Sequence, residues 1–321
     1  MQNFDLTNEI EQINSYLGTL RNNSPYDDEI NDLIDQILQN GGKRIRPLIC
    51  LLSFEMISKE IRNDVSFAAA CALEIIHNAS LIIDDIFDKD VYRRKEKSFY
   101  LKFSTFSALS LTYSMSSLAL RLATQTDIIE IVEEIINAIS VLSSSLFLEK
   151  KFREGGKKMS KDDALQLIDR KTSILFEAAS VIGFLLANSS REDREKMKLF
   201  GRYIGRAFQL RDDYLSLTTN QNDLGKSGTL TDLSNRIQTL IVLEALETLP
   251  KPERKILENY YIEKKNYPIS QIRGILVNSE ALISIKNLIE ENIIKAQSVL
   301  GEFPESIAKE KLLFITSMLH V

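Results

Sequence analysis

The placement of proline is the feature that most constrains how this chain can fold. The six prolines leave a run of roughly two hundred residues after Pro47 in which none occurs. Within this run, apolar residues recur with the period of a helix, as at Ile168 and Leu175, which are seven residues or two helical turns apart. Alternation of the strand type is short or absent. The sequence therefore predicts long helices.

The expected helices fill most of the chain, and neither an internal repeat nor a linker divides them. We therefore expect an all-α fold with one domain over residues 1–321. The predicted helices cover residues 5–18, 27–39, 46–59, 62–88, 99–124, 127–153, 161–187, 191–218 and 235–248, with shorter helices beyond.

The composition is that of an ordinary globular protein, with 44% hydrophobic and 26% charged residues. A net charge of −5 disfavours nucleic-acid binding, which needs a basic surface. We expect no membrane span and, because residues 1–5 do not resemble a secretory signal, a cytoplasmic protein. Cys50 and Cys71 lie in apolar helical patterns and are expected to be buried thiols.

Two acidic motifs stand out against the helical pattern. Asp84, Asp85 and Asp88 follow an apolar run, and Asp212 and Asp213 form a second pair much later in the chain. Asp84 and Asp88 are one helical turn apart and so share a face. Mg²⁺ prefers a few carboxylates and leaves its other positions to water and phosphate oxygens. If the motifs oppose each other they form a magnesium site for a diphosphate; a solvated acidic helix face is the alternative.

A basic turn at residues 41–47 is the first candidate for the phosphate itself. Its two glycines let the backbone approach an oxyanion, Pro47 suits a first helical turn, and Lys43, Arg44 and Arg46 supply charge. A capped, solvated turn is the alternative interpretation. His77 lies two helical turns before Asp84 and should line the same face.

Further polar residues near the two motifs are candidates for contact with diphosphate oxygens. Each of them could by itself be a surface residue, but together they indicate a cavity with acidic walls for metals and cations for phosphates. They are Arg93, Arg94, Lys171, Thr172, Gln209 and Lys226. Lys226 belongs to a glycine-containing loop with the composition of a lid.

These motifs, in this order and spacing, resemble those of the trans-isoprenyl diphosphate synthases, and the resemblance spans most of the chain. It implies a single-domain isoprenoid-synthase-type helical bundle around a central cavity. The implied activity is a Mg²⁺-dependent prenyl transfer, a trans 1'-4 condensation of isopentenyl diphosphate with an allylic diphosphate. The family's usual state is a homodimer. The motifs are Gly41–Pro47, His77, Asp84-Asp85-Asp88, Arg93-Arg94, Lys171-Thr172, Phe208-Gln209, Asp212-Asp213 and Gly225-Lys226.

The resemblance also implies a role for each matching residue. The metal ligands would be Asp84, Asp88 and Asp212. The homoallylic diphosphate would be held by Lys43, Arg46, His77 and Arg94. The allylic diphosphate would be held by Arg93, Lys171, Gln209 and Lys226, with Thr172 beside them. The catalytic set would be Asp84, Asp85, Asp88, Lys171, Asp212 and Asp213.

Product length depends on the residues in the turn before Asp84. Short-chain members of the family usually place an aromatic residue there, whereas this chain has Ala79 and Ser80. One helical turn advances about 5.4 Å, close to one isoprene unit. We therefore expect a product longer than C15, unless an aromatic residue from a facing helix fills the space, for which the candidates are Phe103, Phe106 and Tyr113.

Several positions depart from the family pattern. Ser216 stands where many members have aspartate, Ile237 stands at the position of a late lysine, and no Gly-Asp pair occurs near Thr112-Tyr113. Arg236 could compensate for the missing lysine. Two alternatives stay open: a class I terpene cyclase, suggested by the stripe of Asp212, Ser216 and Asn220, and a weakly active partner subunit of a heteromeric synthase. Prenyl transfer to a peptide is a more distant possibility.

Overall fold

The protein is a bundle of helices, described here from a computed structural model of residues 1–321 with the exception of residues 1–3, 59, 95, 155–158 and 220–230. The first half contains α1 (Thr7–Thr19), η1 (Leu20–Asn23), α2 (Asp28–Gln39), α3 (Ile45–Ile57), α4 (Asp64–Asp88), α5 (Phe99–Lys102), α6 (Thr105–Thr124) and α7 (Ile129–Glu154). A short hairpin of β1 (Tyr92–Arg93) and β2 (Glu96–Lys97) follows α4.

The second half continues the bundle without further strands among its described residues. Its elements are α8 (Lys161–Ile168), η2 (Asp169–Ser173), α9 (Ile174–Leu186), α10 (Arg191–Thr218), α11 (Thr231–Ser234), α12 (Leu240–Thr248), α13 (Lys251–Tyr261), α14 (Ile269–Val277), α15 (Ala281–Gly301) and α16 (Ile307–Ser317). The predicted all-α class is confirmed.

The structure corrects several predicted boundaries. The helix predicted over 99–124 is interrupted at Phe103 and Ser104, because the Ser104 side chain accepts a hydrogen bond from the backbone N–H of Ser107 and begins α6 anew. The helix predicted over 235–248 begins only at Leu240. The C-terminal helices are not all short, since α15 runs over 21 residues.

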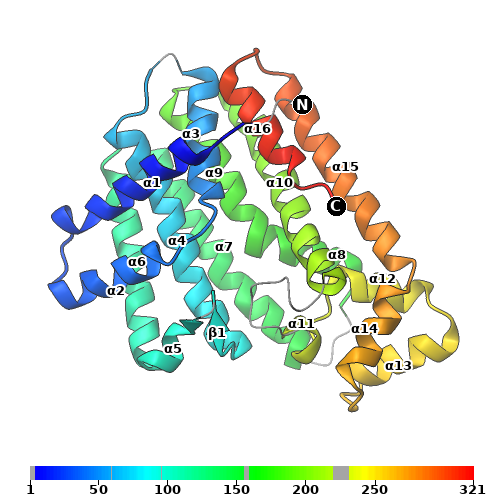
Figure 1. Cartoon of the computed structure of the whole chain (residues 1–321). Coiled ribbons are helices and arrows are strands. Elements are labelled where there is room, and N and C mark those ends of the chain that lie inside the picture. Colours follow the sequence, from blue (N-terminus) through cyan, green and yellow to red (C-terminus); the bar gives the residue numbers. More distant parts are fainter. Residues whose placement is uncertain (1–3, 59, 95, 155–158, 220–230) are drawn as a thin grey trace.

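Helix α9 lies at the centre of the bundle, between α3, α4 and α10 (Figure 1). Every residue from Ile174 to Leu185 is buried, which explains why this segment is apolar all round rather than on one face. The hydrophobic core extends from Ile13 to Leu319 as one cluster. Cys50 and Cys71 are buried in it as free thiols, as predicted.

Two glycines allow α9 and η2 to approach their neighbours closely. A Cβ atom on Gly183 would lie 2.4 Å from the carbonyl oxygen of Cys50 in α3. A Cβ atom on Gly205 of α10 would lie 2.5 Å from the Cα atom of Ser173 in η2. Real Cβ atoms do not come so close to backbone, so these contacts require glycine. Gly205 thereby fixes the distance between α10 and η2.

Among the described residues, two helices are long and apolar enough to cross a membrane, by length and composition alone. They are α4 and the segment Ile129–Arg153 of α7, each with a mean hydropathy of 1.6 in its most apolar window. The window in α4 is 72% buried inside the protein, as in a core helix, whereas that in α7 is only 22% buried. Helix α7 therefore leaves an apolar face uncovered within the single chain.

Replacing Gly205 with alanine should destabilise the protein by about 1–3 kcal/mol, because the new methyl group forces α10 away from η2. The control is Gly274→Ala in α14, where nothing lies within 4 Å and alanine should stabilise the helix by about 0.5–1 kcal/mol. Urea denaturation measures both changes. Equal stability of Gly205→Ala and the wild type would contradict the packing argument.

Candidate active site

The first acidic motif lies at the C-terminal end of α4. A capping box of Asn63 and Ser66 begins this helix, and Lys89, with a φ angle of 56°, ends it. Asp84, Asp85 and Asp88 therefore occupy the end of the helix at which the helix dipole already concentrates negative charge, and no basic residue lies in that last turn. Such an arrangement needs cations from other elements.

Lys171 and Arg153 provide these cations. The ammonium nitrogen of Lys171 lies 3.6 Å from Asp84 Oδ1 and 2.6 Å from Glu149 Oε2. Arg153 Nη2 lies 2.7 Å from Asp88 Oδ1 and also contacts Glu149. Burial lowers the pKa of Lys171, but Asp84 and Glu149 outweigh burial and leave its pKa above the ordinary value. Lys171 therefore carries its charge throughout the physiological range.

Glu149 and Arg153 are functional candidates that the sequence analysis did not identify. Both come from α7, one helical turn apart, and Glu149 is only 4% exposed. Burial raises the pKa of Glu149, but Lys171 and Arg153 outweigh burial and lower it below the ordinary value. A glutamate directly after Leu146-Phe147-Leu148, with an arginine four residues later, was the only sequence signal for this pair.

The second acidic motif reaches the same place through η2. This element is a single π-helical turn, a departure from the α-helix that is frequent at functional sites. Thr172 Oγ1 donates a hydrogen bond of 2.6 Å to Gln209 Oε1, and Gln209 Nε2 donates one of 2.8 Å to Asp213 Oδ1. Lys171 and Thr172 are consecutive, so η2 connects Asp84 of α4 with Asp213 of α10. Asp212 is the exposed neighbour of Asp213 on α10.

The basic turn at residues 41–47 forms a second cluster of charge together with Arg94. Gly41 and Gly42 have φ angles of 78° and 138°, which glycine adopts without strain. Arg94 of the hairpin region donates hydrogen bonds to the carbonyl oxygens of Gly41 (2.5 Å) and Asn40 (3.2 Å). Lys43 is exposed at the surface. The chain reversal that the two glycines permit therefore brings Arg94 next to the basic turn.

Arg44, the middle cation of the turn, is structural. Its side chain is buried and forms an ion pair of 2.7 Å with Glu74, which is also buried. Its Nε donates a hydrogen bond of 2.9 Å to Asn14 Oδ1, and its Nη2 contacts the carbonyl oxygen of Leu38. With these partners, Arg44 fastens the turn to α1, α2 and α4.

His77 and Arg46 are neighbours in the cluster around the basic turn. Burial lowers the pKa of His77 well below its usual range, and the nearby guanidinium groups of Arg46 and Arg94 lower it further. Burial also lowers the pKa of Arg46 to about 10, which leaves this side chain charged at neutral pH. Its guanidinium lies over the ring of Phe176, 4.8 Å from the centroid. A neutral imidazole among cations can donate a hydrogen bond to an anion.

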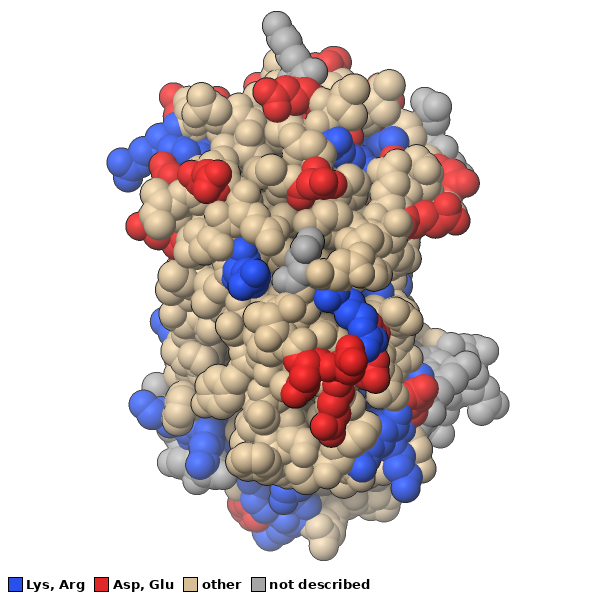
Figure 2. All heavy atoms as spheres, turned by 90° about the vertical axis from the view of Figure 1, so that its left-hand side faces the viewer, with Lys and Arg blue, Asp and Glu red and all other residues tan. Residues whose placement is uncertain are grey.

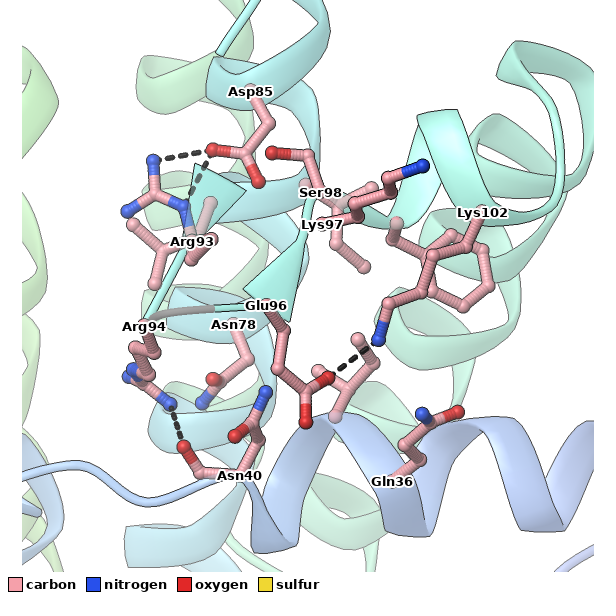
Figure 3. A pocket seen from close by; sticks show the side chains of 14 residues that line it. Gln36, Asn40, Asn78, Asp85, Arg93, Arg94, Glu96, Lys97, Ser98 and Lys102 are labelled. Atoms are coloured by element: carbon pink, nitrogen blue, oxygen red, sulfur yellow. Dashed lines mark hydrogen bonds and ion pairs between the residues drawn. The ribbon is translucent and has the colours of Figure 1, made fainter. Parts of the chain in front are cut away.

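Asp85 points in a different direction from Asp84 and Asp88. It is 3% exposed, its carboxylate accepts hydrogen bonds from Arg93, and burial raises its pKa to about 6 (Figure 3). Adjacent residues on a helix lie about 100° apart, so this orientation follows from the helix geometry. Asp85 thus orients Arg93, as Asp213 orients Gln209.

The pocket in Figure 3 lies behind Arg93 and Arg94, between α2, α4, the hairpin and α5. Besides Asp85, Arg93 and Arg94, its polar lining comprises Gln36, Asn40, Asn78, Glu96, Lys97, Ser98 and Lys102. Lys102 contacts Glu96 at 2.5 Å across it. Arg93 and Arg94 line the pocket, whereas Asp84 and Asp88 do not.

The predicted product length depends on the surroundings of Ala79 and Ser80, the small residues in the turn before Asp84. Ala79 is 5% exposed and buried in the bundle, and Ser80 Oγ donates a hydrogen bond of 2.8 Å to the His77 carbonyl oxygen. The three aromatic residues that could have filled the space instead are all turned to the surface of the chain. Phe103, Phe106 and Tyr113 are 46%, 82% and 78% exposed.

The segment after the second motif is described only in part. Lys226, Gly225 and Asn220 lie outside the described residues. Asn235 Nδ2 donates a hydrogen bond of 3.0 Å to the carbonyl oxygen of Asp88, which places residues 235–237 beside the first motif. Arg236, expected as a substitute for the late lysine, instead donates to Asn266 Oδ1 (3.0 Å) and lies over Tyr260.

The donor groups fit a metal that arrives with a diphosphate. Among the described residues, no group of three or more His, Cys, Asp or Glu side chains is arranged as a ready metal cage. Asp84 and Asp88 are instead paired with Lys171 and Arg153. Mg²⁺ in phosphate-binding sites usually takes one or two carboxylates and completes its shell with water and substrate oxygens. Two carboxylates at the end of α4 meet that requirement.

Comparison with known proteins identifies the family of the chain. The sequence profile of the family "Polyprenyl synthetase" matches residues 27–276. The chain belongs to the polyprenyl synthetase family. It is 32% identical to the geranylgeranyl diphosphate synthase of Methanosarcina mazei over 216 residues, which are 66% of this chain and 65% of that protein. It is 29% identical to the octaprenyl diphosphate synthase of Haemophilus influenzae over 86% of this chain and 83% of that protein.

Solved structures of the polyprenyl synthetase family share the fold. A polyprenyl synthase from Caulobacter crescentus, complexed with calcium and isoprenyl diphosphate, has a TM-score of 0.88 at 24% identity and covers 98% of this chain and 94% of that one. The heptaprenyl diphosphate synthase of Staphylococcus aureus has a TM-score of 0.87 at 24% identity, with 99% and 98% covered. The isoprenoid-synthase-type bundle expected from the motifs is therefore confirmed.

Lowering the pH from 7.5 to 5.5 should reduce the free energy of unfolding more in the wild type than in His77→Gln. The pKa of His77 is lowered in the folded protein, so the unfolded chain binds a proton below about pH 6.5 that the folded protein does not bind. This loss of stability has a slope of at most ~1.4 kcal/mol per pH unit. Urea denaturation at both pH values measures the difference, and parallel losses in the two proteins would argue against a buried neutral imidazole.

Proposed function

We propose that this protein is a prenyltransferase that condenses isopentenyl diphosphate with an allylic diphosphate and depends on Mg²⁺. The observation that carries the proposal is that η2 links both acidic motifs, through Lys171 to Asp84 and through Thr172 and Gln209 to Asp213. The cluster of His77, Arg46 and Arg94 gathers positive charge around an imidazole and suits a second diphosphate. A terpene cyclase, which binds one diphosphate, has no use for that cluster.

The proposed metal ligands are Asp84, Asp88 and Asp212. Bound Mg²⁺ would neutralise the charge that develops on the departing diphosphate. Lys171, kept protonated by Asp84 and Glu149, holds a positive charge at the same place. Asp85 and Asp213 act as positioning residues, because their carboxylates fix Arg93 and Gln209.

The proposed reaction breaks the bond between C1 of the allylic substrate and its diphosphate oxygen, and the diphosphate leaves with the electron pair. The alkene of isopentenyl diphosphate then attacks C1 with its C4, and the resulting cation loses a proton from C2 to the released diphosphate. On the homoallylic side, Lys43, Arg46, His77 and Arg94 would hold the second substrate in place. Arg93, Lys171, Gln209 and Lys226 would hold the allylic diphosphate. The apolar bundle excludes water from the cation.

We further propose a product longer than C15, since Ala79 is small and the side chains of Phe103, Phe106 and Tyr113 turn outward. The core cluster supports treating residues 1–321 as one domain. The cytoplasmic location stays a prediction from the N-terminal sequence.

Incubation of the pure protein with Mg²⁺, labelled isopentenyl diphosphate and allylic primers of increasing length tests the function. We expect extended products beyond C15, and Asp84→Asn should lower kcat on the order of 100-fold or more while its circular dichroism stays unchanged. The control is Asp162→Asn on the surface of α8, with wild-type turnover. Cyclic hydrocarbon formed without isopentenyl diphosphate would favour a cyclase, and activity only with a second polypeptide would favour the partner-subunit alternative.

We also propose a homodimer formed through α6 and α7. Phe106, Leu109 and Tyr113 are exposed on one stripe of α6, at spacings of three and four residues. Ile129, Ile136 and Phe147 of α7 are exposed on one face as well, and α7 packs on α6. Figure 2, which turns the side of α2 and α6 toward the viewer, shows wide areas without charged side chains. Exposed apolar side chains gathered on two helices that pack together indicate a protein interface.

The double substitution Phe106→Glu and Tyr113→Glu should shift the protein from dimer to monomer, because two charges would be buried in the interface. Sedimentation velocity measures the mass. Ile283→Glu on α15, at the opposite side of the bundle in Figure 1, is the control and should leave the dimer intact. A monomeric wild type, or a dimer that tolerates both glutamates, would remove α6 and α7 as the interface.

A further inference from the structure

Arg153 is the one arginine of α7 that reaches the first acidic motif. It lies in the last turn of the helix with its side chain 20% exposed. Its Nη2 is shared by two carboxylates, Asp88 Oδ1 at 2.7 Å and Glu149 Oε1. No family motif identified in the sequence includes this position.

The guanidinium of Arg153 is held in a fixed orientation. It lies over the ring of Phe87, 4.5 Å from the centroid, while Glu149, itself 4% exposed, anchors it from within α7. Its Nε is buried and has no hydrogen-bond partner within the described part of the chain. An arginine with a fixed plane and an unused donor is suited to bind a planar or tetrahedral oxyanion beside the carboxylate that it already contacts.

Two further cations lie near Arg153. Burial lowers the pKa of Lys264 in the α13–α14 loop, and the charges of Arg236 and Arg153 lower it further. Arg236 is engaged by Asn266 and Tyr260, and Ile237 carries no charge. Within the described ranges, Arg153 is the arginine that forms an ion pair with the proposed metal ligand Asp88, at 2.7 Å.

We propose that Arg153 binds the diphosphate of the allylic substrate on the Asp88 side of the site. The inference rests on the proposed prenyl transfer and adds a residue to it. In the free protein, the guanidinium of Arg153 forms an ion pair with Asp88. If Asp88 bound a metal, the guanidinium would keep Glu149 as its anchor, and its unused Nε together with the Nη2 released from Asp88 would be available to the diphosphate oxygens. Lys171 plays the matching part on the Asp84 side, where it also shares Glu149.

The test compares Arg153→Met, which removes the charge, with Arg153→Lys, which keeps the charge and loses the planar fork. Arg202→Met is the matched control, because Arg202 forms a comparable ion pair with the buried Glu177 (2.7 Å) away from the acidic motifs. For each variant, calorimetry measures the Kd of inorganic pyrophosphate with and without Mg²⁺. Steady-state kinetics measure KM separately for the two substrates.

We expect Arg153→Met to weaken pyrophosphate binding and to raise KM for the allylic substrate about tenfold or more, as for loss of a charge-assisted hydrogen bond. KM for isopentenyl diphosphate should stay within about twofold of the wild-type value, Arg153→Lys should recover part of the loss, and Arg202→Met should match the wild type. An unchanged pyrophosphate Kd in Arg153→Met, or an equal rise of both KM values, would overturn the proposal.

The pyrophosphate titration separates this inference from the proposed function. If the wild-type protein forms no prenyl product, the proposed function is refuted. The pyrophosphate titration still decides whether Arg153 binds a diphosphate. If Arg153→Met does not fold, as judged by circular dichroism, Arg153→Lys decides alone. A pyrophosphate Kd for Arg153→Lys equal to that of the wild type would then count against the role of the planar guanidinium.

Discussion

The compensation of half-buried carboxylates at the C-terminal end of α4 is the interaction on which the site depends. Asp84 and Asp88 lie where the helix dipole is already negative, so they can be held there only if cations from other elements approach them. Lys171 of η2 and Arg153 of α7 do so, and Glu149 binds both cations. Removing one charge would leave its partners buried without compensation, which is costly. Three helical elements are thus fixed at one point by charge.

The packing of α9 and η2 explains how the second motif reaches the same point. Helix α9 is buried all round, and Gly205 lets α10 approach η2 at backbone distance. This close approach brings Thr172 within hydrogen-bond distance of Gln209, and the π-helical turn presents Lys171 and Thr172 as neighbours. The polar contact between Thr172 and Gln209 therefore depends on Gly205, a residue without a side chain.

The anion cluster around His77 has a different physical basis. It collects Arg46 and Arg94 around the half-buried imidazole of His77, and Arg44 holds the turn in place through Glu74. Burial and neighbouring cations keep His77 neutral. A cluster with more positive than negative charge attracts an anion without a metal, which distinguishes it from the carboxylate site and fits the use of two different diphosphates.

The sequence by itself determined the helical class, the two acidic motifs and the basic turn, because these depend on local periodicity and on residue type. It did not identify Glu149 and Arg153, whose relation to Asp88 arises only when α7 packs beside α4. It also could not distinguish Arg44, which precedes α3 with a φ angle of 49°, from Arg46 in the first turn of that helix. Nor could it distinguish Asp85 from Asp84, since adjacent residues on a helix point to different surroundings. Only the tertiary structure decided those roles, because charge pairing depends on distances between elements that are far apart in the chain.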